Sequence, residues 1–370
     1  MRTGAESRMN FLADSLSRRG LEVHVFARKR EAELTICKNV FFHKSPWLDK
    51  AVLRPDSIRS FARVSAVCLK NLNKLLGGYR FDIVQSEELR LVMPGLVLSK
   101  LTRAPLILDE PDVEFDKARQ WGAWGNWRRI LLLEKLFCRN ARQVLTSSSR
   151  EKEIMQHSFG LSDSRISVIP NGVDTNWFSP GGGKDLRGEL GLSERPVVLF
   201  MGNFGYFPNV DALSLIVSEL LLRVKEAVRD VVFLIIGKGL SLTAASPTYN
   251  LMPVGFVSDP RPYMDIADVC ISPLRYGGGT RIKILEYMSM GKAVVSTSKG
   301  CEGLAVTRES DILVEDKVDG FAKAIVALLR NDDLTRKIGQ KARETAVRSY
   351  DWSDIASRLA SVYAQVLNGS

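Results

Sequence analysis

The sequence predicts an α/β protein with two doubly wound domains, each built on a parallel sheet. Short runs of β-branched and aliphatic residues alternate along the whole chain with longer amphipathic stretches. This alternation favours parallel strands joined by crossover helices. The 370 residues are enough for two full-sized cores. NGVDTNWFSPGGGKD, residues 171–185, is rich in Gly, Pro and Asn and separates two series of such runs, which predicts an interdomain linker over residues 171–184.

The first domain is expected to span residues 1–170. Its first helix is expected to begin at Gly4 and to end near Gly20, with no strand before it. A loop that approaches phosphate normally follows a strand, so either the first strand is missing or the start of the chain was assigned too late. The predicted strands are Val23–Ala27, Asp82–Ser86, Leu106–Asp109, Gln143–Ser147 and Ser167–Asn171.

The second domain is expected to span residues 185–350. Its clearest predicted helices are Asn209–Ala227 and Val318–Arg330, and residues 351–370 are expected to form a last helix, Trp352–Leu367, that packs back on the first domain. The predicted strands are Val197–Gly202, Val231–Gly237, Leu251–Phe256, Val269–Leu274, the AVVST run at residues 293–297, and Asp311–Val314.

The composition predicts a cytoplasmic protein. The longest apolar runs, such as Val231–Ile236, are too short to span a bilayer, and the first residues lack the apolar core of a signal peptide. The five cysteines are scattered and odd in number, as is typical of reduced thiols. The net charge of +10 (52 − 42) favours anionic partners such as nucleotide-sugars, lipid phosphates or the cytoplasmic leaflet. It does not favour nucleic acid, because the charge is spread along the chain without a recognisable binding motif.

The most specific segment is PLRYGGGTRIKILEYMSMGKAVV, residues 273–295. A predicted strand runs into Gly277–Gly279, and a predicted helix follows with Arg281, Lys283 and Glu286 in its first turns. Glycines let backbone N–H groups approach a ligand, and a helix N-terminus favours negative charge. The two cations add charge-assisted hydrogen bonds to phosphate oxygens, and the carboxylate can accept hydrogen bonds from ribose hydroxyls. The segment therefore predicts a sugar-nucleotide site.

The simpler interpretation of this segment is an ordinary helix surface. Glu286 would then pair with Lys283 at helical spacing, and Arg281 would be a solvated cation of the first turn. Cations at a helix N-terminus oppose the helix macrodipole, so their placement favours an anion between them. We therefore favour the binding site, with Arg281 as the stronger of the two cationic candidates.

In the order and spacing of its motifs, the chain resembles the retaining, nucleotide-sugar-dependent glycosyltransferases of family 4. GAE at residues 4–6 with RRGLEV at residues 18–23 is similar to that family's opening glycine loop, helix and second strand. SVIPNGVDTNWFSP at residues 167–180 is similar to its crossover into the second domain, and residues 255–297 to its donor-site core. The resemblance implies the GT-B fold, with two Rossmann-like domains facing across a cleft. It also implies hexosyl transfer from a nucleoside diphosphate with retention, in polysaccharide or glycolipid assembly.

The resemblance implies roles for single donor-side residues. Glu286 matches the second acid of the family's paired-glutamate motif and would hold the ribose, while Gly278 stands where the first acid would be. Arg281 and Lys283 would face the donor diphosphate. The basic residue that the family carries just after Gly202 is absent from GNFGYFPN. The other donor-binding candidates, which line the base pocket or approach the donor through the backbone, are Gly4, Gly202, Gly255, Phe256, Val257, Gly277, Gly279 and Thr280.

The acceptor side is expected in LDEPDVEF, residues 108–115, which is similar to the family's acceptor-side loop. Pro111 stands where some relatives carry a histidine, and Asp109, Glu110 and Asp112 remain as candidates. An alternative interpretation makes Asp109 a loop acid and Asp112 a turn former, and the sequence leaves the two interpretations open.

Three tryptophans, Trp121, Trp124 and Trp127, lie beside Arg128 and Arg129. We expect these tryptophans to pack on the core of the first domain. The alternative is an interfacial patch that docks peripherally on an anionic membrane carrying a lipid-linked acceptor.

No metal or other cofactor is expected, since the chain contains no Asp-x-Asp pair. The expected partners are a nucleotide-sugar donor and a sugar or lipid-linked acceptor. One alternative is a non-catalytic or degraded nucleotide-sugar-binding subunit, and another is a related epimerase or phosphorylase of the same fold. A nicotinamide dehydrogenase is a poor third, because no G-x-G-x-x-G follows a predicted strand.

Overall fold

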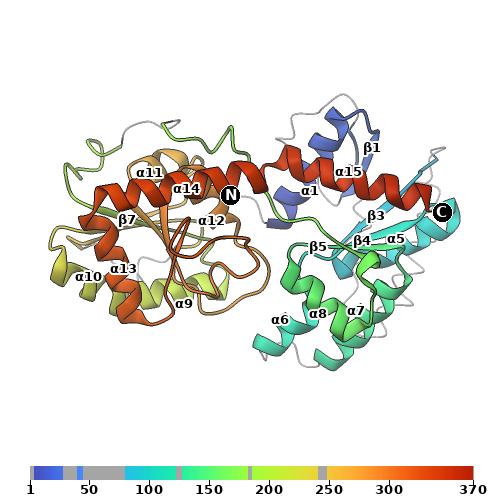
Figure 1. Ribbon diagram of the computed structural model, residues 1–370, viewed down its shortest axis with the longest axis horizontal. Helices are drawn as coiled ribbons and strands as arrows, with labels where there is room; N and C mark the ends of the chain where they lie inside the picture. The colour runs from blue at the N-terminus through green and yellow to red at the C-terminus, as the bar shows by residue number, and fades with distance from the viewer. Residues whose placement is uncertain are drawn as a thin grey trace. The chain divides into compact units, whose positions relative to one another are not determined.

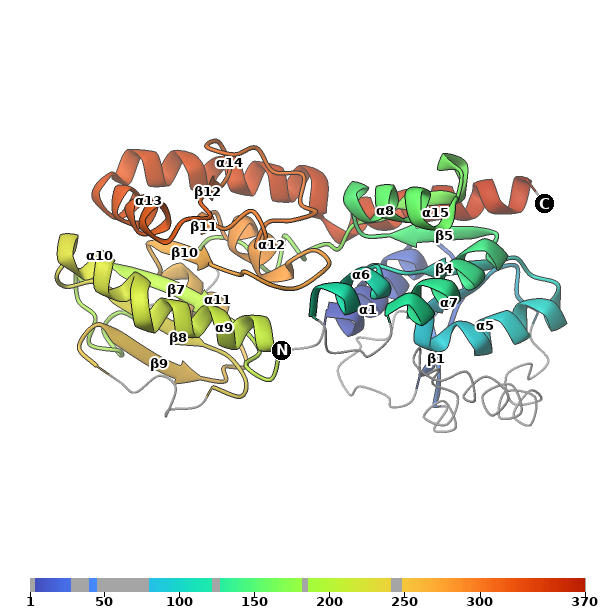
Figure 2. The same cartoon turned by 90° about the horizontal axis from the view of Figure 1, so that it is seen from below.

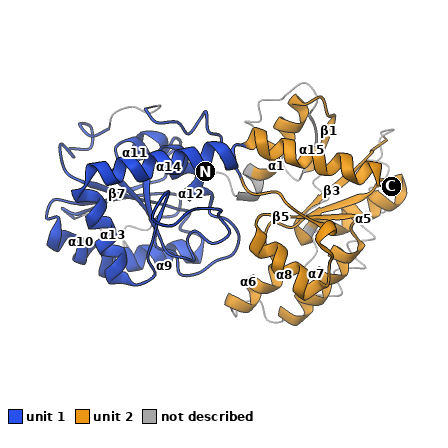
Figure 3. Ribbon diagram, in the orientation of Figure 1, with its two compact units in different colours: residues 1–3, 172–351 blue, residues 4–171, 352–370 orange. Residues whose placement is uncertain are grey.

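The computed structural model describes residues 4–27, 40–44, 80–121, 127–181, 186–240 and 248–369. They fall into two compact units (Figure 3): unit 1 contains residues 172–351, and unit 2 contains residues 4–171 together with the C-terminal segment from residue 352. Each unit is a parallel-sheet α/β domain, so the predicted fold class is confirmed.

Unit 1 is built on a six-stranded parallel sheet with the order β12-β11-β10-β7-β8-β9. Its strands are β7 (Val197–Met201), β8 (Val232–Ile236), β9 (Leu251–Gly255), β10 (Val269–Ser272), β11 (Ala293–Ser296) and β12 (Leu313–Val314). Its helices are α9 (Phe207–Leu215), α10 (Leu221–Ala227), α11 (Arg261–Asp265), α12 (Ile282–Ser289), α13 (Val318–Arg330) and α14 (Asp332–Tyr350).

Both faces of the unit 1 sheet are buried. Along β7, Val198 and Phe200 pack into one apolar cluster, whereas Val197, Leu199 and Met201 pack into another. Helices α9, α10 and α13 cover the first face, and α11 and α12 cover the second (Figures 1 and 2). A strand that is buried on both faces consists of a continuous run of apolar residues. The core strands of this unit could therefore be predicted from the sequence.

The predicted helix Asn209–Ala227 is interrupted. A π-helical turn, Ile216–Leu220, lies between α9 and α10. The hydrophobic period of the sequence continues through this turn, so it gave no sign of the change in hydrogen bonding.

Unit 2 contains a four-stranded parallel sheet, β3-β4-β5-β6, and a separate parallel pair, β1-β2. Strand β2 lies outside the predicted strands. The strands are β1 (Val23–Ala27), β2 (Val40–Lys44), β3 (Val84–Glu87), β4 (Leu106–Asp109), β5 (Gln143–Thr146) and β6 (Ile166–Val168). The helices are α1 (Gly4–Arg18), α5 (Glu88–Thr102), α6 (Glu114–Trp121), α7 (Trp127–Asn140), α8 (Ser149–Phe159) and α15 (Trp352–Asn368).

The C-terminal helix α15 belongs to unit 2 (Figure 3). The rings of Phe11 and Trp352 stack with centroids 5.4 Å apart. Leu359 of α15 shares an apolar cluster with Leu12 of α1 and with Ile107 of β4. The last helix therefore completes the core of a unit whose other elements come from the first half of the chain.

Helix α1 is the first described element, beginning at Gly4, and the described residues before β1 contain no strand. The missing first strand therefore stays a prediction. Trp124 lies outside the described residues. Within them, no helix is both long enough and apolar enough to cross a bilayer.

Candidate functional site

The predicted donor-site residues of unit 1 gather at one edge of its sheet. Gly202 follows β7, Gly255 ends β9, and the loop of residues 273–281 follows β10. These strands are parallel, so their carboxyl ends meet at the edge where ligands of doubly wound sheets bind. Phe256 is 58% exposed next to Gly255, whereas Val257 is buried.

The glycine loop has the backbone that its sequence predicts. Gly277 has φ +114° and Gly279 has φ +68°, values that favour glycine. The loop ends at the buried Thr280, and Arg281 is the N-cap residue of α12. A Cβ atom on Gly277 would lie 2.8 Å from Nη2 of Arg281, so glycine there leaves room for the guanidinium. Gly278, in place of an acid, offers only its backbone.

The Arg281 side chain is held by the loop that precedes it. Its Nη1 donates hydrogen bonds to the carbonyls of Gly278 and, at 2.7 Å, Gly279. The residue is 8% exposed, and its Nε and Nη2 atoms are buried without a hydrogen-bond partner. Buried donors without acceptors are costly, and an anionic oxygen beside the N-terminus of α12 would satisfy both of them.

Lys283 is positioned by Asn209, which sequence reasoning missed. Its Nζ donates to Oδ1 of Asn209 at 2.7 Å and lies 4.5 Å from the centroid of the Phe200 ring. The Asn209 amide is oriented in turn, because its Nδ2 donates to the Asn203 carbonyl at 2.8 Å. A Cβ atom on Gly202 would lie 2.8 Å from Cγ of Asn209, so the glycine makes room for this amide.

Lys283 and Glu286 both titrate near neutral pH. Burial, followed by the charge of Arg281, lowers the pKa of Lys283 to about 7. Burial also raises the pKa of Glu286 to about 7, against the opposing effect of Lys283. No described residue donates a hydrogen bond to the Glu286 carboxylate, so both of its oxygens can accept hydrogen bonds from a ligand.

Of the three acceptor-side candidates in unit 2, Asp109 is fully buried in an ion pair. Its carboxylate accepts hydrogen bonds from Nε and Nη2 of Arg8, at 2.8 and 3.0 Å. Nη1 of Arg8 donates to the Pro170 carbonyl at 3.0 Å and to Asn171 at 3.3 Å. The Arg8–Asp109 pair therefore joins α1 to β4 and to residues 170–171, and this buried ion pair gives Asp109 a structural role. A contact of Asp109 with an acceptor stays a prediction.

Glu110 is also buried, and its Oε2 has no hydrogen-bond partner. Burial, and then the charge of Glu134, raises the pKa of Glu110 well above its ordinary value. Glu134 accepts hydrogen bonds from the backbone N–H groups of Glu114 and Phe115 at 2.7 and 3.0 Å, and burial raises its pKa to about 8. This carboxyl group caps α6 from α7. Glu110 lies inside unit 2, and its role at an acceptor stays a prediction.

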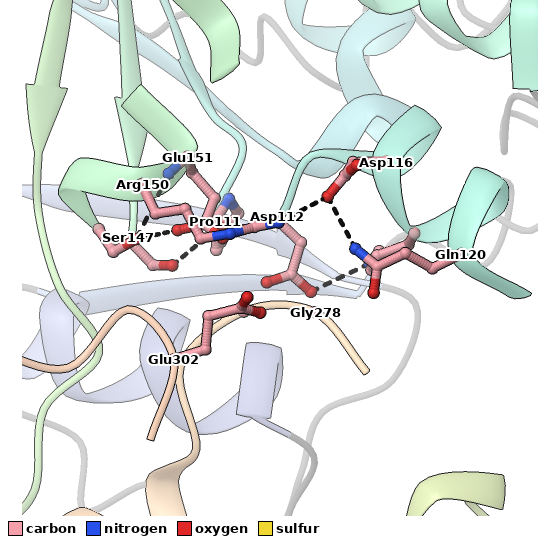
Figure 4. A network of polar contacts seen from close by, with 12 residues as sticks. Pro111, Asp112, Asp116, Gln120, Ser147, Arg150, Glu151, Gly278 and Glu302 are labelled. Atoms are coloured by element: carbon pink, nitrogen blue, oxygen red, sulfur yellow. Dashed lines mark hydrogen bonds and ion pairs between the residues drawn. The ribbon is translucent and has the colours of Figure 1, made fainter. Parts of the chain in front are cut away.

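Asp112 is the acceptor-side candidate that reaches the surface. Its side chain is 32% exposed and pairs with Lys117 at 3.0 Å. Figure 4 shows the surrounding network: Ser147 donates to the Pro111 carbonyl at 2.6 Å, and Arg150 pairs with Asp116 at 2.9 Å. The loop that carries Asp112 is thus fixed to the start of α8.

Two family models match the chain. The model of "Glycosyltransferase Family 4" matches residues 2–177, and the model of "Glycosyl transferases group 1" matches residues 195–331. The matched ranges cover most of both units, including the glycine loop and α12.

Curated relatives are glycosyltransferases. A D-inositol 3-phosphate glycosyltransferase of Corynebacterium efficiens is 27% identical over 312 residues, which are 78% of this chain and 72% of that protein. An Escherichia coli UDP-Gal:alpha-D-GlcNAc-diphosphoundecaprenol alpha-1,3-galactosyltransferase is 23% identical over 338 residues, which are 84% of this chain and 85% of that protein.

Solved structures share the fold. Anabaena HepE in complex with UDP superimposes with a TM-score of 0.71 and 16% identity, over 97% of this chain and 96% of that one. The family models, the relatives and the fold agree. The chain belongs to glycosyltransferase family 4, is a hexosyltransferase and has the GT-B fold.

Proposed function

We propose that this glycosyltransferase transfers a hexose from a nucleoside-diphosphate donor to an acceptor with retention of configuration, using the site at Gly277–Glu286. The observation that carries the proposal is Arg281, whose Nε and Nη2 are buried without partners beside the N-terminus of α12. A diphosphate is the leaving group of this reaction. Cations and helix N-termini aimed at its developing charge lower the barrier.

Each residue of the site has a proposed role. Arg281, Lys283 and the backbone of Gly277–Thr280 hold the diphosphate, and Glu286 accepts hydrogen bonds from the ribose hydroxyls. Gly202, Gly255, Phe256 and Val257 are assigned to contacts with the base and the rest of the donor. Asp112 is retained as the acceptor-side residue, because its carboxylate reaches the surface of unit 2.

We propose that the charge of the leaving group is balanced by Arg281 and Lys283 without a metal ion. The test is the transfer rate after exhaustive treatment with a chelator. We expect an unchanged rate, and a loss that is restored by Mg²⁺ or Mn²⁺ would refute this part of the proposal.

The acceptor is proposed to be a sugar or a lipid-linked sugar in polysaccharide or glycolipid assembly, as the name of the galactosyltransferase relative suggests. The test offers the purified protein a panel of labelled nucleotide-sugars together with sugar and lipid-linked acceptors. We expect transfer from at least one donor. Donor binding without transfer to any acceptor would instead favour the non-catalytic alternative.

The pH dependence of donor use is expected to follow Lys283. Its ammonium form attracts the diphosphate and has a pKa of about 7, so kcat/KM for the donor should fall on the alkaline side of this region. The ionisation of Glu286, whose pKa is also about 7, sets the acidic side. In Asn209→Asp a carboxylate replaces the amide that accepts from Nζ, and a nearby opposite charge raises a lysine pKa. The pH at which kcat/KM falls should therefore be higher in Asn209→Asp than in the wild type, and lower in Asn209→Leu. Superimposable profiles for all three proteins would show that Asn209 does not control Lys283.

Peripheral membrane contact is proposed for the exposed face of α7. Leu132 and Leu136, one turn apart, are 66% and 51% exposed, and Arg128 lies one turn before Leu132 on the same face. Such a face suits an anionic bilayer surface. Burying one leucine contributes about 1.5–3 kcal/mol, so Leu132→Ser/Leu136→Ser should weaken binding to vesicles with anionic lipid at least tenfold. Leu222→Ser, at a 44% exposed position of unit 1, is the control, and equal binding by all three proteins would contradict the proposal.

A further inference from the structure

Four arginines line a hollow in unit 2, whereas the donor-site residues at Gly277–Glu286 belong to unit 1. The hollow has a volume of about 500 Å³, and Arg103, Arg139, Arg142 and Arg165 lie around it. Such a volume lies within the range of small-molecule sites. The rest of the lining contains no carboxylate, and Ser99 and Asn140 add neutral polar groups.

The sequence places three of these arginines before three neighbouring strands. Arg103 lies three residues before β4, Arg142 directly precedes β5, and Arg165 directly precedes β6. The strands are parallel and adjacent, so these positions meet at the amino edge of the sheet. The acceptor-side loop follows β4 at the opposite, carboxyl edge. The hollow is therefore distinct from the acceptor-side region.

The charges of the four guanidinium groups are not neutralised within the described part of the chain. None of the four forms an ion pair with a described carboxylate; their hydrogen bonds go to backbone carbonyls. Arg139 donates to the Phe159 carbonyl at 2.8 Å, Arg142 to the Gly369 carbonyl, and Arg165 to the carbonyls of Arg139 and Ala141.

Several donors remain unused. Each guanidinium carries five N–H groups, and Nε of Arg165 is buried without a partner. Arg103 is exposed and adopts φ +61° at the C-cap of α5, and its guanidinium donates no hydrogen bond to a described residue. Helix ends explain part of the cluster, because cations favour a helix C-terminus and Arg103 and Arg139 lie at the ends of α5 and α7. Arg142 and Arg165 also serve helix ends: Arg142 donates to the Gly369 carbonyl just after α15, and Arg165 donates to carbonyls at the end of α7. These contacts leave Nε of Arg165 without a partner and the side chain of Arg103 without any described hydrogen bond.

We propose that this hollow is a second anion site, which binds a phosphate-bearing ligand independently of the donor site. Arginine forks match phosphate oxygens bidentately, and four of them without an acid favour a ligand with more than one negative charge. The phosphate could be carried by a soluble diphosphate or by the headgroup of an anionic lipid, and both present the same oxygens to the arginines.

The test measures binding of inorganic diphosphate to the full chain by calorimetry at low ionic strength. Arg103→Asn/Arg142→Gln removes two exposed cations of the hollow, and asparagine tolerates the left-handed backbone at residue 103. Arg103→Asn alone is the milder variant, since that side chain makes no internal hydrogen bond. Arg281→Ala removes the donor-site contact, and Arg348→Gln on α14 of unit 1 removes one exposed charge elsewhere.

Two binding events are expected in the wild type. In the double variant, the affinity of one event should fall at least tenfold, while the sugar-transfer rate should not change. Arg103→Asn alone should weaken the same event to a smaller extent. Arg281→Ala should lose only the other event, and Arg348→Gln should keep both. The proposal would be overturned if the wild type showed a single binding event that only Arg281→Ala loses. It would also be overturned if the double variant bound diphosphate as the wild type does.

A second arm identifies the source of the phosphate. The same proteins are sedimented with vesicles of phosphatidylcholine, with and without phosphatidic acid. If the double variant loses both diphosphate and phosphatidic acid binding, the ligand is a lipid headgroup. If it loses diphosphate binding alone, the ligand is soluble. The proposed donor site and the proposed second anion site are tested by different variants. Arg281→Ala tests only the donor site, and Arg103→Asn/Arg142→Gln tests only the hollow.

Discussion

Replacing Arg281 with alanine is expected to lower kcat/KM for sugar transfer about a hundredfold, or ~3 kcal/mol in the barrier. The reason is the geometry of this side chain. Its Nη1 donates a hydrogen bond to the glycine loop, while Nε and Nη2 have no partner and are the donors proposed to meet the diphosphate. Contacts that strengthen in the transition state act on kcat as well as on KM. Steady-state kinetics with the preferred nucleotide-sugar provide the measurement.

Arg275 supplies the matched control. It lies in the same loop, is 49% exposed and pairs with Asp211 at 2.6 Å, so Arg275→Ala should leave the rate within a few-fold of wild type. Arg281→Lys keeps the charge but loses the planar fork, and its rate should lie between those of wild type and Arg281→Ala. Equal rates for Arg281→Ala and Arg275→Ala would remove Arg281 from the proposed mechanism.

Replacing Arg8 with methionine is expected to destabilise the protein by ~3–5 kcal/mol, because the Asp109 carboxylate would remain buried without its partner. Both side chains of this pair are almost fully excluded from water. Arg8 also holds the Pro170 carbonyl and Asn171, so the end of unit 2 would lose contacts as well. Urea denaturation, followed by circular dichroism, measures the change.

Arg18→Met on the same helix is the control for this change. Arg18 pairs with Asp14 at 2.9 Å with its side chain 67% exposed, and exposed pairs contribute less than ~1 kcal/mol. The double variant Arg8→Met/Asp109→Leu should regain part of the lost stability, since no buried charge is then left over. A cost for Arg8→Met no larger than that for Arg18→Met would contradict the ion-pair account.

The sequence predicted the parts of the fold whose signal is local. Helix α13 has the bounds that were predicted, and β7 and β8 were recognisable as fully buried apolar runs. Strand β2, VFFHK, was not, because a short apolar run does not distinguish a strand from a piece of buried helix. The π-turn at Ile216–Leu220 was missed because it alters hydrogen bonding but not hydrophobic periodicity.

In the candidate site, too, contacts within one short segment could be predicted, whereas contacts between distant segments could not. Gly277, Arg281 and Glu286 belong to one short segment, so their association could be argued from sequence alone. Asn209 lies 74 residues before Lys283, and Arg8 lies 101 residues before Asp109. Only the packing of the sheets brings these pairs together. The same packing buries Asp109, the last residue of β4, and Glu110, which follows it; their positions in the sequence could not reveal this burial.

We propose that the protein moves a hexose from a nucleoside diphosphate with retention at the glycine-loop site. The most direct test of this proposal is a nuclear magnetic resonance spectrum of the product that the wild-type protein forms from an anomerically pure, α-linked nucleotide-sugar. We expect an α-linked product, whose formation is slowed about a hundredfold in Arg281→Ala. A β-linked product, or α-linked product formed at the wild-type rate by Arg281→Ala, would contradict this proposal.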